Sequence, residues 1–377
     1  MTGWISAIWN GQTGLCLKNP KMSSTDYLDD YNYNYSIYID DDFAPLCENH
    51  EASLFGGVFA QVFYSLIFLL SLTGNILVLW ILMKYEKLKT VTDIFILNLV
   101  TSDLLFSCSL PFWAVDHAHG WIFGKAMCKI MSSIFFIGYY SGIMLLTLIT
   151  LDRYFAVVHA LSAVRIRKVC YGVVTCVVVW CISILATVPE TIFSDVVADG
   201  RESFSCHNIY PKGSEVTWKM LGYYQQNILF FLIPFSVIVL SYYKIFSTVV
   251  KCKARKKHKA VRVIFCIVVV FFLCWTPYNI VIFLISLIDQ MPLLLTCSVE
   301  NHLIYALFIC RNLAYFHCCL NPFFYVFVGT KFREHFMPLA SKRFPYLKTC
   351  TEISSTKQNS SQNYWDVDFH LHTLLEI

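Results

Sequence analysis

Charged residues are scarce in this sequence. They make up 14% of the 377 residues, whereas hydrophobic residues make up 57%. A soluble domain needs far more charge to keep its surface in water. The composition therefore excludes an ordinary soluble globular protein and predicts a chain that is solvated largely by a lipid bilayer.

The sequence also lacks a strong net charge and a basic domain. Its formal net charge is +4, which is small for this length, and its Lys and Arg residues are scattered between apolar runs. A nucleic-acid-binding protein would concentrate basic residues on one folded domain. We expect no nucleic-acid partner.

Several patterns that mark other protein classes are missing. Residues 1–22 have no continuous apolar core after a basic start, so no cleaved signal peptide is expected and the first apolar run is expected to direct insertion. We find no repeated halves or charged pairs in the middle of apolar runs, as many transporters have. Paired nucleophiles, bases or metal ligands are also missing, so we predict no enzyme and no cofactor.

Long apolar runs are abundant. Crossing about 30 Å of hydrocarbon takes roughly 20 helical residues, because every backbone polar group must find its partner within the segment. Seven runs are long enough, near residues 57–83, 91–115, 126–158, 169–189, 223–250, 260–288 and 301–328. The predicted fold is an all-α membrane protein with seven transmembrane helices, whose two ends lie on opposite sides.

Lys and Arg gather in the connections after the first, third and fifth runs. They are Lys84, Lys87, Lys89, Arg165, Arg167, Lys168, Lys251, Lys253, Arg255, Lys256, Lys257, Lys259 and Arg262. Basic residues near the ends of spans are retained in the cytoplasm. We therefore expect a multi-pass plasma-membrane protein with its N-terminus outside and its C-terminus inside. The basic cluster after the fifth run either serves only as this anchor or also contacts a partner protein and anionic membrane lipid.

The predicted outer tail, residues 1–54, is acidic and rich in tyrosine. Residues 22–52 contain eight acidic residues, five tyrosines and no Lys or Arg. Such a segment is too poor in aliphatic residues to fold alone. Its carboxylates would also attract a basic protein at long range. We name Tyr27, Tyr31 and Tyr33 as candidate contacts and sulfation sites, and Asn34 as a glycosylation site.

Four of the 16 cysteines fall at informative places on the predicted outer side: Cys47, Cys128, Cys206 and Cys297. Most of the others lie in apolar helices, where a thiol is a small hydrophobic group. Two disulfide bonds are the simplest interpretation in this oxidising compartment, although the sequence alone allows other pairings.

Polar residues within the runs suggest a switch. Asp103 in the second run is predicted to meet Asn75 and Asn321 around trapped water or a sodium ion, unless it is merely a satisfied buried carboxylate. Arg153, beside Asp152 and followed by Tyr154, ends the third run, where a guanidinium can be held by its neighbour or released toward a partner.

Two prolines are expected to kink the later runs. Pro277 removes a backbone donor near Trp275, and Pro322 follows Asn321 directly in a run that ends in Tyr325. A helix that pivots at a proline can open a cavity at its inner end.

In this order, the motifs resemble those of rhodopsin-like G-protein-coupled receptors, over roughly residues 45–340. The motifs are Gly74-Asn75, Asp103, Asp152-Arg153-Tyr154, Trp180, Pro234 with Tyr242, Cys274-Trp275-Thr276-Pro277 and Asn321-Pro322-Phe323-Phe324-Tyr325. The resemblance implies a heterotrimeric G protein as partner, disulfide bonds Cys128–Cys206 and Cys47–Cys297, a bundle over residues 55–330 and an amphipathic helix at 331–340. In the tail 341–377, serines and threonines are candidate sites for receptor kinases and arrestin.

Within that family the chain resembles the chemokine receptors, whose ligands are small basic proteins. The resemblance lies in Ser109-Leu110-Pro111-Phe112-Trp113, in His317-Cys318-Cys319-Leu320-Asn321-Pro322, in the outer cysteine pair and in the acidic tail. Many of these receptors have Glu where this chain has Arg311. That departure is similar to the XC class, which binds lymphotactin, although Asp152 stands where the XC form that we compared has His.

The resemblance implies a two-part mechanism. The tail holds the chemokine core, while the chemokine N-terminus enters among Tyr64, Trp113, Phe135, Tyr278 and Arg311, although aromatic residues at such positions are more often packing residues. Binding then favours a conformer in which the sixth helix swings outward at its proline and activates an inhibitory-class G protein. The alternative is a scavenging receptor that internalises chemokine without coupling to a G protein.

Overall fold

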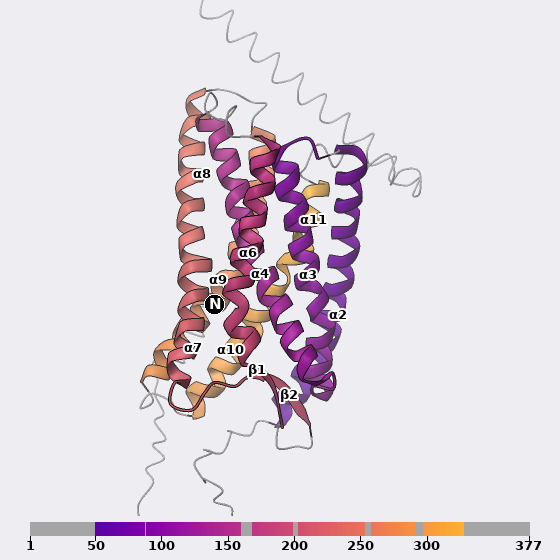
Figure 1. Cartoon of the computed structure of the whole chain (residues 1–377), viewed down its shortest axis with the longest axis vertical. Helices are drawn as coiled ribbons and strands as arrows, with labels where there is room; N and C mark the ends of the chain where they lie inside the picture. Colours follow the sequence, from indigo (N-terminus) through magenta and orange to yellow (C-terminus); the bar gives the residue numbers. More distant parts are fainter. Residues whose placement is uncertain are drawn as a thin grey trace, which may run out of the picture. The chain divides into compact units, whose positions relative to one another are not determined.

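The computed structural model describes residues 50–86, 88–159, 168–198, 203–252, 258–291 and 297–327. Long helices make up most of this part of the chain (Figure 1). They are α2 (His50–Ile81), α3 (Val91–His119), α4 (Gly124–Val158), α6 (Val169–Phe193), α7 (Glu215–Tyr224), α8 (Ile233–Cys252), α9 (His258–Gln290), α10 (Cys297–Tyr315) and α11 (His317–Phe327). Two π-helical segments, η1 (Leu82–Glu86) and η2 (Gln225–Leu232), continue α2 and join α7 to α8.

Seven helical segments are long and apolar enough to cross a membrane. They are Val58–Tyr85, Val91–His119, Gly124–Val158, Val169–Phe193, Glu215–Val249, Ile264–Gln290 and His302–Tyr325. The predicted seven-helix membrane bundle is therefore confirmed. The largest difference in bounds is in span 5, which begins at Glu215 because the η2 segment keeps α7 and α8 in one continuous helix.

Helix α4 occupies the centre of the bundle. It packs against α3, α6 and α8, while α11 closes the bundle by packing against α2 (Figure 1). The buried interior is rich in large side chains, including Trp275, Tyr139 and Phe106. Large apolar side chains are also exposed along the outer faces, for example Val174 and Val177 of α6. An extended apolar exterior around a packed core is what a bilayer solvates.

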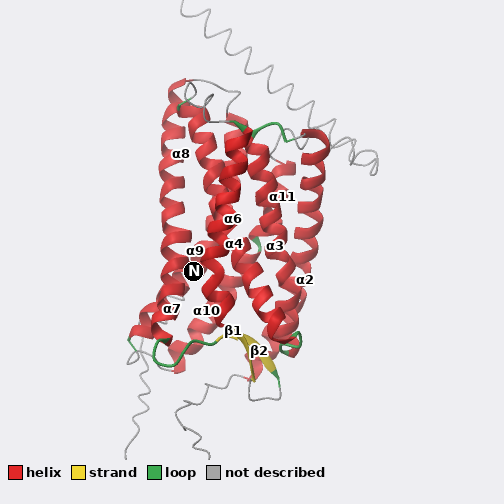
Figure 2. Ribbon diagram, in the orientation of Figure 1, coloured by secondary structure: helices red, strands yellow, loops and turns green. Residues whose placement is uncertain are grey.

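Two of the later spans depart from regular α-helix. Span 7 is divided into α10 and α11 at Phe316, six residues before Pro322 (Figure 2). In span 5, segment η2 ends just before Pro234, which has no N–H for the carbonyl of Phe230. In span 6, Pro277 lies inside α9, which is α-helical along its whole length.

A short antiparallel hairpin covers one end of the bundle, a departure from the all-α expectation (Figure 2). Strands β1 (Ser194–Ala198) and β2 (Phe204–Asn208) pair with Val196 opposite Cys206. Cys206 forms the predicted disulfide bond with Cys128 of α4. Gly120 has φ 78°, and a Cβ there would lie 2.7 Å from the carbonyl oxygen of Phe204, so only glycine fits between α3 and β2.

Several predictions fall outside the described residues. These are Tyr27, Tyr31, Tyr33, Asn34, Cys47, the amphipathic helix at 331–340 and the tail 341–377. The side chain of Cys297 also lies outside them, so the pairing of Cys47 with Cys297 stays a prediction.

Candidate functional site

A cavity of about 370 Å³ lies beneath the β hairpin. Its lining comprises Trp113, Ser132, Phe135, Phe136, Glu190, Cys206, His207, Asn208, Tyr210, Lys219, Gly222, Tyr223, Gln226, Tyr278, Ile282, Arg311 and Tyr315. The structure thus brings together four of the five bundle residues predicted to contact a ligand, Trp113, Phe135, Tyr278 and Arg311. Seven of these 17 residues are Phe, Tyr or Trp and seven others are polar or charged, a combination of apolar area and orienting groups that suits a ligand pocket.

Tyr64, the fifth predicted contact, is not among the lining residues. It is fully buried, and its ring lies 5.4 Å from that of Tyr315 and 5.8 Å from that of His117. Tyr64 therefore supports the cavity wall from behind.

Arg311 of α10 is surrounded by neutral groups. Its Nη2 atom lies 3.4 Å from Nε2 of His117, and it interacts electrostatically with Tyr64, Tyr278 and Tyr315. His117 was not predicted from the sequence, although it follows Trp113 by four residues, the spacing that places two side chains on one helical face.

Glu190 supplies a negative charge on another wall of the cavity. It lies near the end of α6, and its Oε2 accepts a hydrogen bond of 2.5 Å from Nδ2 of Asn208. Burial raises the pKa of the neighbouring Tyr210 phenol, and the Glu190 charge acts in the same direction, so Tyr210 stays neutral at physiological pH. Glu190 was not predicted from the sequence, where its signal is an isolated acidic residue at the end of an apolar run.

Two lysines at the start of α4 fix the hairpin above the cavity. Lys125 lies 2.6 Å from Asp195, and this hydrogen bond lowers the pKa of the Asp195 carboxyl. Lys129 donates to the carbonyl oxygens of Thr191 and Ile192 at the end of α6. A cation at a helix C-terminus is favourable, because the unsatisfied carbonyl groups carry partial negative charge.

Aromatic rings connect the cavity wall to span 6. The ring of Phe135 lies 4.9 Å from Phe106, which meets Trp275 edge-on at 6.1 Å. Trp275 is 1% exposed and stacks on Tyr139 at 3.9 Å, two residues before Pro277. Displacement of the cavity wall must therefore displace closely packed rings beside the proline.

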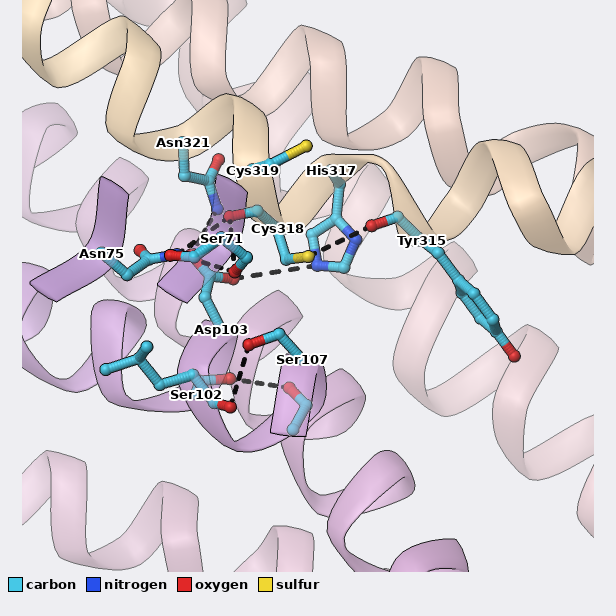
Figure 3. Close-up of polar contacts among 12 residues, drawn as sticks. Ser71, Asn75, Ser102, Asp103, Ser107, Tyr315, His317, Cys318, Cys319 and Asn321 are labelled. Carbon is cyan, nitrogen blue, oxygen red and sulfur yellow. Dashed lines mark hydrogen bonds and ion pairs between the residues drawn. The ribbon is translucent and has the colours of Figure 1, made fainter. Parts of the chain in front are cut away.

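Asp103 of α3 is contacted by two residues of span 7 (Figure 3). Asn321 donates to its Oδ2 at 2.8 Å, and His317 Nε2 lies 3.8 Å from its Oδ1. His317 Nδ1 lies 2.6 Å from the Ala314 carbonyl oxygen, which can only accept a hydrogen bond, so Nδ1 carries the proton.

A sodium ion at Asp103 has little support from these contacts. Hard cations prefer oxygen ligands. In the part of the chain that the structure describes, both side chains that approach the carboxylate present nitrogen atoms. The donor set therefore does not fit a sodium cage built of protein oxygens.

Asn75, which was predicted to meet Asp103, donates a hydrogen bond to the backbone of span 7. Its Nδ2 donates at 3.0 Å to the carbonyl oxygen of Cys318 (Figure 3). In a regular helix that carbonyl would accept from residue 322, but Pro322 has no N–H. Span 1 thus satisfies the backbone acceptor that the proline leaves open.

Arg153 is held at the end of the bundle opposite the hairpin. It lies 2.9 Å from Oδ2 of Asp152, and Thr92 of α3 donates to the same oxygen at 2.7 Å. Arg153 also donates to the Thr92 hydroxyl. The guanidinium is therefore fixed by its own neighbour and by a second helix, as the predicted held state requires.

Three tyrosines predicted to belong to the switch lie around this end. Tyr242 packs edge-on against Phe265 and interacts with Thr150 and Arg153. The hydroxyl of Tyr154 lies 3.1 Å from Nε2 of His159, whereas Tyr325 is buried in α11. The interaction with Tyr242 thus places this tyrosine beside the arginine.

Comparison with known proteins agrees with this geometry. Residues 74–325 match the model of the 7 transmembrane receptor (rhodopsin family). Chemokine XC receptor 1 of Homo sapiens is 44% identical over 289 residues, covering 77% of this chain and 83% of the relative. C-C chemokine receptor type 4 of Homo sapiens is 39% identical over 333 residues, covering 88% and 89%. C-C chemokine receptor type 8 of Homo sapiens is 36% identical over 350 residues, covering 89% and 98%.

The family model spans most of the seven-helix bundle, and the relatives extend over more than three quarters of the chain. The chain therefore belongs to the rhodopsin family of seven-transmembrane receptors and, within it, to the chemokine receptors.

Proposed function

We propose that this receptor binds a small basic chemokine of the lymphotactin type at the hairpin end and activates an inhibitory-class heterotrimeric G protein at the other end. The proposal rests on two features at opposite ends of one bundle. A cavity with aromatic residues in its lining lies at the hairpin end, and Arg153 is bound by Asp152 at the other end. As a multi-pass plasma-membrane protein, the receptor would place its N-terminal tail and the cavity outside the cell.

The mechanism follows the packing between the two ends. A chemokine segment in the cavity presses on Phe135, and the rings of Phe106 and Trp275 transmit this displacement to span 6 at Pro277. An outward swing of the inner part of span 6 favours the conformer in which Arg153 leaves Asp152 and meets a G-protein helix. Ligand binding then shifts a two-state equilibrium by its difference in affinity for the two states.

The proposed ligand subtype rests on the similarity to Chemokine XC receptor 1 together with Arg311. A panel of purified chemokines that includes lymphotactin, read out by calcium release in transfected cells, tests this choice. Strong activation by a chemokine of another class and none by lymphotactin would contradict the subtype.

Replacing Arg153 by alanine separates signalling from binding. We expect Arg153→Ala to reduce chemokine-evoked G-protein activation more than tenfold, because the variant lacks the guanidinium that meets the G protein. Chemokine binding should change less than threefold, since Arg153 lies far from the cavity lining. Both are measured on matched membranes, with labelled chemokine for binding and nucleotide exchange for activation.

The control is Lys168→Ala, which removes an exposed cation at the start of α6 and should leave both measurements near the wild-type values. If the wild-type receptor binds chemokine but activates no G protein, the scavenging function is correct instead.

Weakening the contacts that keep Arg153 against Asp152 should raise signalling, the opposite of the effect of Arg153→Ala. In Thr92→Val the hydroxyl that joins α3 to the Asp152–Arg153 pair is lost. A hydrogen bond to a charged group contributes about 1.5–3 kcal/mol, so its loss would raise the equilibrium constant for release of Arg153 by about 10- to 150-fold, and we expect basal nucleotide exchange to rise at least severalfold. Thr101→Val is the matched control, because that hydroxyl is exposed and bonds only the Leu97 carbonyl of its own helix. Unchanged basal exchange in Thr92→Val at equal expression would count against the held state.

A further inference from the structure

The lining of the cavity carries two opposite charges. Arg311 comes from α10 and Glu190 from α6, and both act on the ring of Tyr278. The cavity is therefore polar, with its positive and negative groups supplied by different helices. A pocket with this polarity favours a ligand that is itself dipolar, and it disfavours the reversed orientation.

Arg311 retains unused capacity to bind an anion. A guanidinium is always protonated and carries five N–H donors. In the described ranges no acidic residue contacts Arg311, its neighbours are His117 and neutral tyrosines, and its buried Nε has no hydrogen-bond partner. A buried charge without a counterion is costly, and a carboxylate that accepts two parallel hydrogen bonds is its best geometric match.

Glu190 is free to receive a cation from the cavity. Its Oε2 is held by Asn208, while its Oε1 points toward Gly222, where even a Cβ would lie 3.4 Å away. Lys219 also lines the cavity but is paired with Glu215 at 2.8 Å, and no other cation contacts Glu190 within the described residues. Gly222, which also lines the cavity, places no side chain against Oε1.

The size of the cavity limits what can join the two charges. A volume of about 370 Å³ is at the small end of the range for ligand pockets. It takes the end of an extended chain, not a folded domain. The aromatic lining also favours an ammonium group, because ring faces attract cations.

We propose, on the basis of the chemokine-receptor function above, that the cavity selects a chemokine N-terminus with two opposite charges. The α-ammonium of the inserted segment pairs with Glu190, and an acidic side chain close behind it pairs with Arg311. The order of these two charges along the chemokine N-terminus determines which chemokines activate the receptor.

The test couples changes in the receptor to changes in the chemokine. The probe is the most potent chemokine from the panel above, synthesised unchanged, with its α-amine acetylated, and with the acidic residues before its first cysteine replaced by their amides. Each form is assayed for potency of G-protein activation on wild type, Arg311→Gln and Glu190→Gln. Binding of the unchanged form shows that each variant is folded at the surface.

We expect two independent couplings, one between Arg311 and the acidic side chain of the chemokine and one between Glu190 and its α-ammonium. Arg311→Gln should lower the potency of the unchanged chemokine by 10- to 100-fold, yet lower that of the amide form less than threefold, because the partner is already lost. Glu190→Gln should behave in the same way toward the acetylated form. Lys212→Gln, which removes an exposed cation outside the cavity lining, should change no potency more than twofold.

The proposal would be overturned if the losses in potency were additive both for Arg311→Gln with the amide form and for Glu190→Gln with the acetylated form. A fully potent chemokine without a carboxylate before its first cysteine would also overturn it. Crossed coupling, in which Glu190→Gln cancels the effect of the amide form, would overturn the proposed orientation. These outcomes all require a chemokine that binds and activates. If no chemokine binds, the proposed function itself fails.

Discussion

Gly138→Ala is expected to prevent most of the receptor from folding. A Cβ at this position would lie 2.9–3.0 Å from the Cβ, Cα and backbone nitrogen of Phe106. Backbone atoms cannot move aside by a rotamer change, so α3 and α4 would have to separate. Overpacking typically costs about 1–3 kcal/mol, and separation would also weaken the 2.7 Å hydrogen bond from Ser102 to the Gly138 carbonyl. We expect severalfold lower surface expression and a lower thermal unfolding midpoint in detergent.

Gly142→Ala provides the matched control, one helical turn further along α4. A Cβ at Gly142 would meet only the Ser102 hydroxyl oxygen at 3.3 Å, a contact that a side chain can relieve by a few tenths of an ångström. Expression and unfolding midpoint should stay close to those of wild type. Equal behaviour of the two alanine variants would show that the contact between α3 and α4 is not limiting.

Removing the disulfide bond is expected to have the second large effect. Cys128 and Cys206 are 78 residues apart, and their bond fixes the hairpin that covers the cavity. Loss of a native disulfide costs about 2–5 kcal/mol, more for long loops. We expect Cys128→Ser with Cys206→Ser to lower surface expression severalfold and to abolish chemokine binding by the receptor that remains, measured by flow cytometry with labelled chemokine.

The matched control for this variant is Cys108→Ser with Cys181→Ser. Both cysteines are free and exposed on the outer faces of the bundle, so their thiols contribute little to packing. Expression and binding should be retained. Normal chemokine binding in the variant without the disulfide bond would mean that the hairpin keeps its position without it.

The spans were predictable because they depend on local properties, whereas the bends at Pro277 and Pro322 stay predictions. An apolar run of sufficient length has to be helical in a bilayer, whatever its neighbours. Pro277 and Pro322 likewise act on their own helices. The disulfide bond between Cys128 and Cys206 was predicted from a family resemblance, since the sequence alone leaves other pairings open.

The other features of the site depend on residues that are distant in the sequence and meet only in the fold. No pattern in α6 indicates that Glu190 contacts Asn208, because Asn208 lies in a separate hairpin, which the Cys128–Cys206 bond joins to α4. Tyr64 lies in the wall and not in the lining because Tyr315 occupies the space in front of it. The partner of Asn75 is a backbone carbonyl, and a backbone atom leaves no signature in the sequence.

That bond from Asn75 gives the first transmembrane helix an unexpected role. Among the described residues, α2 supplies none of the cavity lining, but it supplies the donor for the acceptor exposed by Pro322. Movement of α11 near Pro322 is therefore coupled to α2 through this hydrogen bond. A change in α2 can thus alter the equilibrium constant between resting and active receptor while the chemokine's affinity for each separate state stays the same.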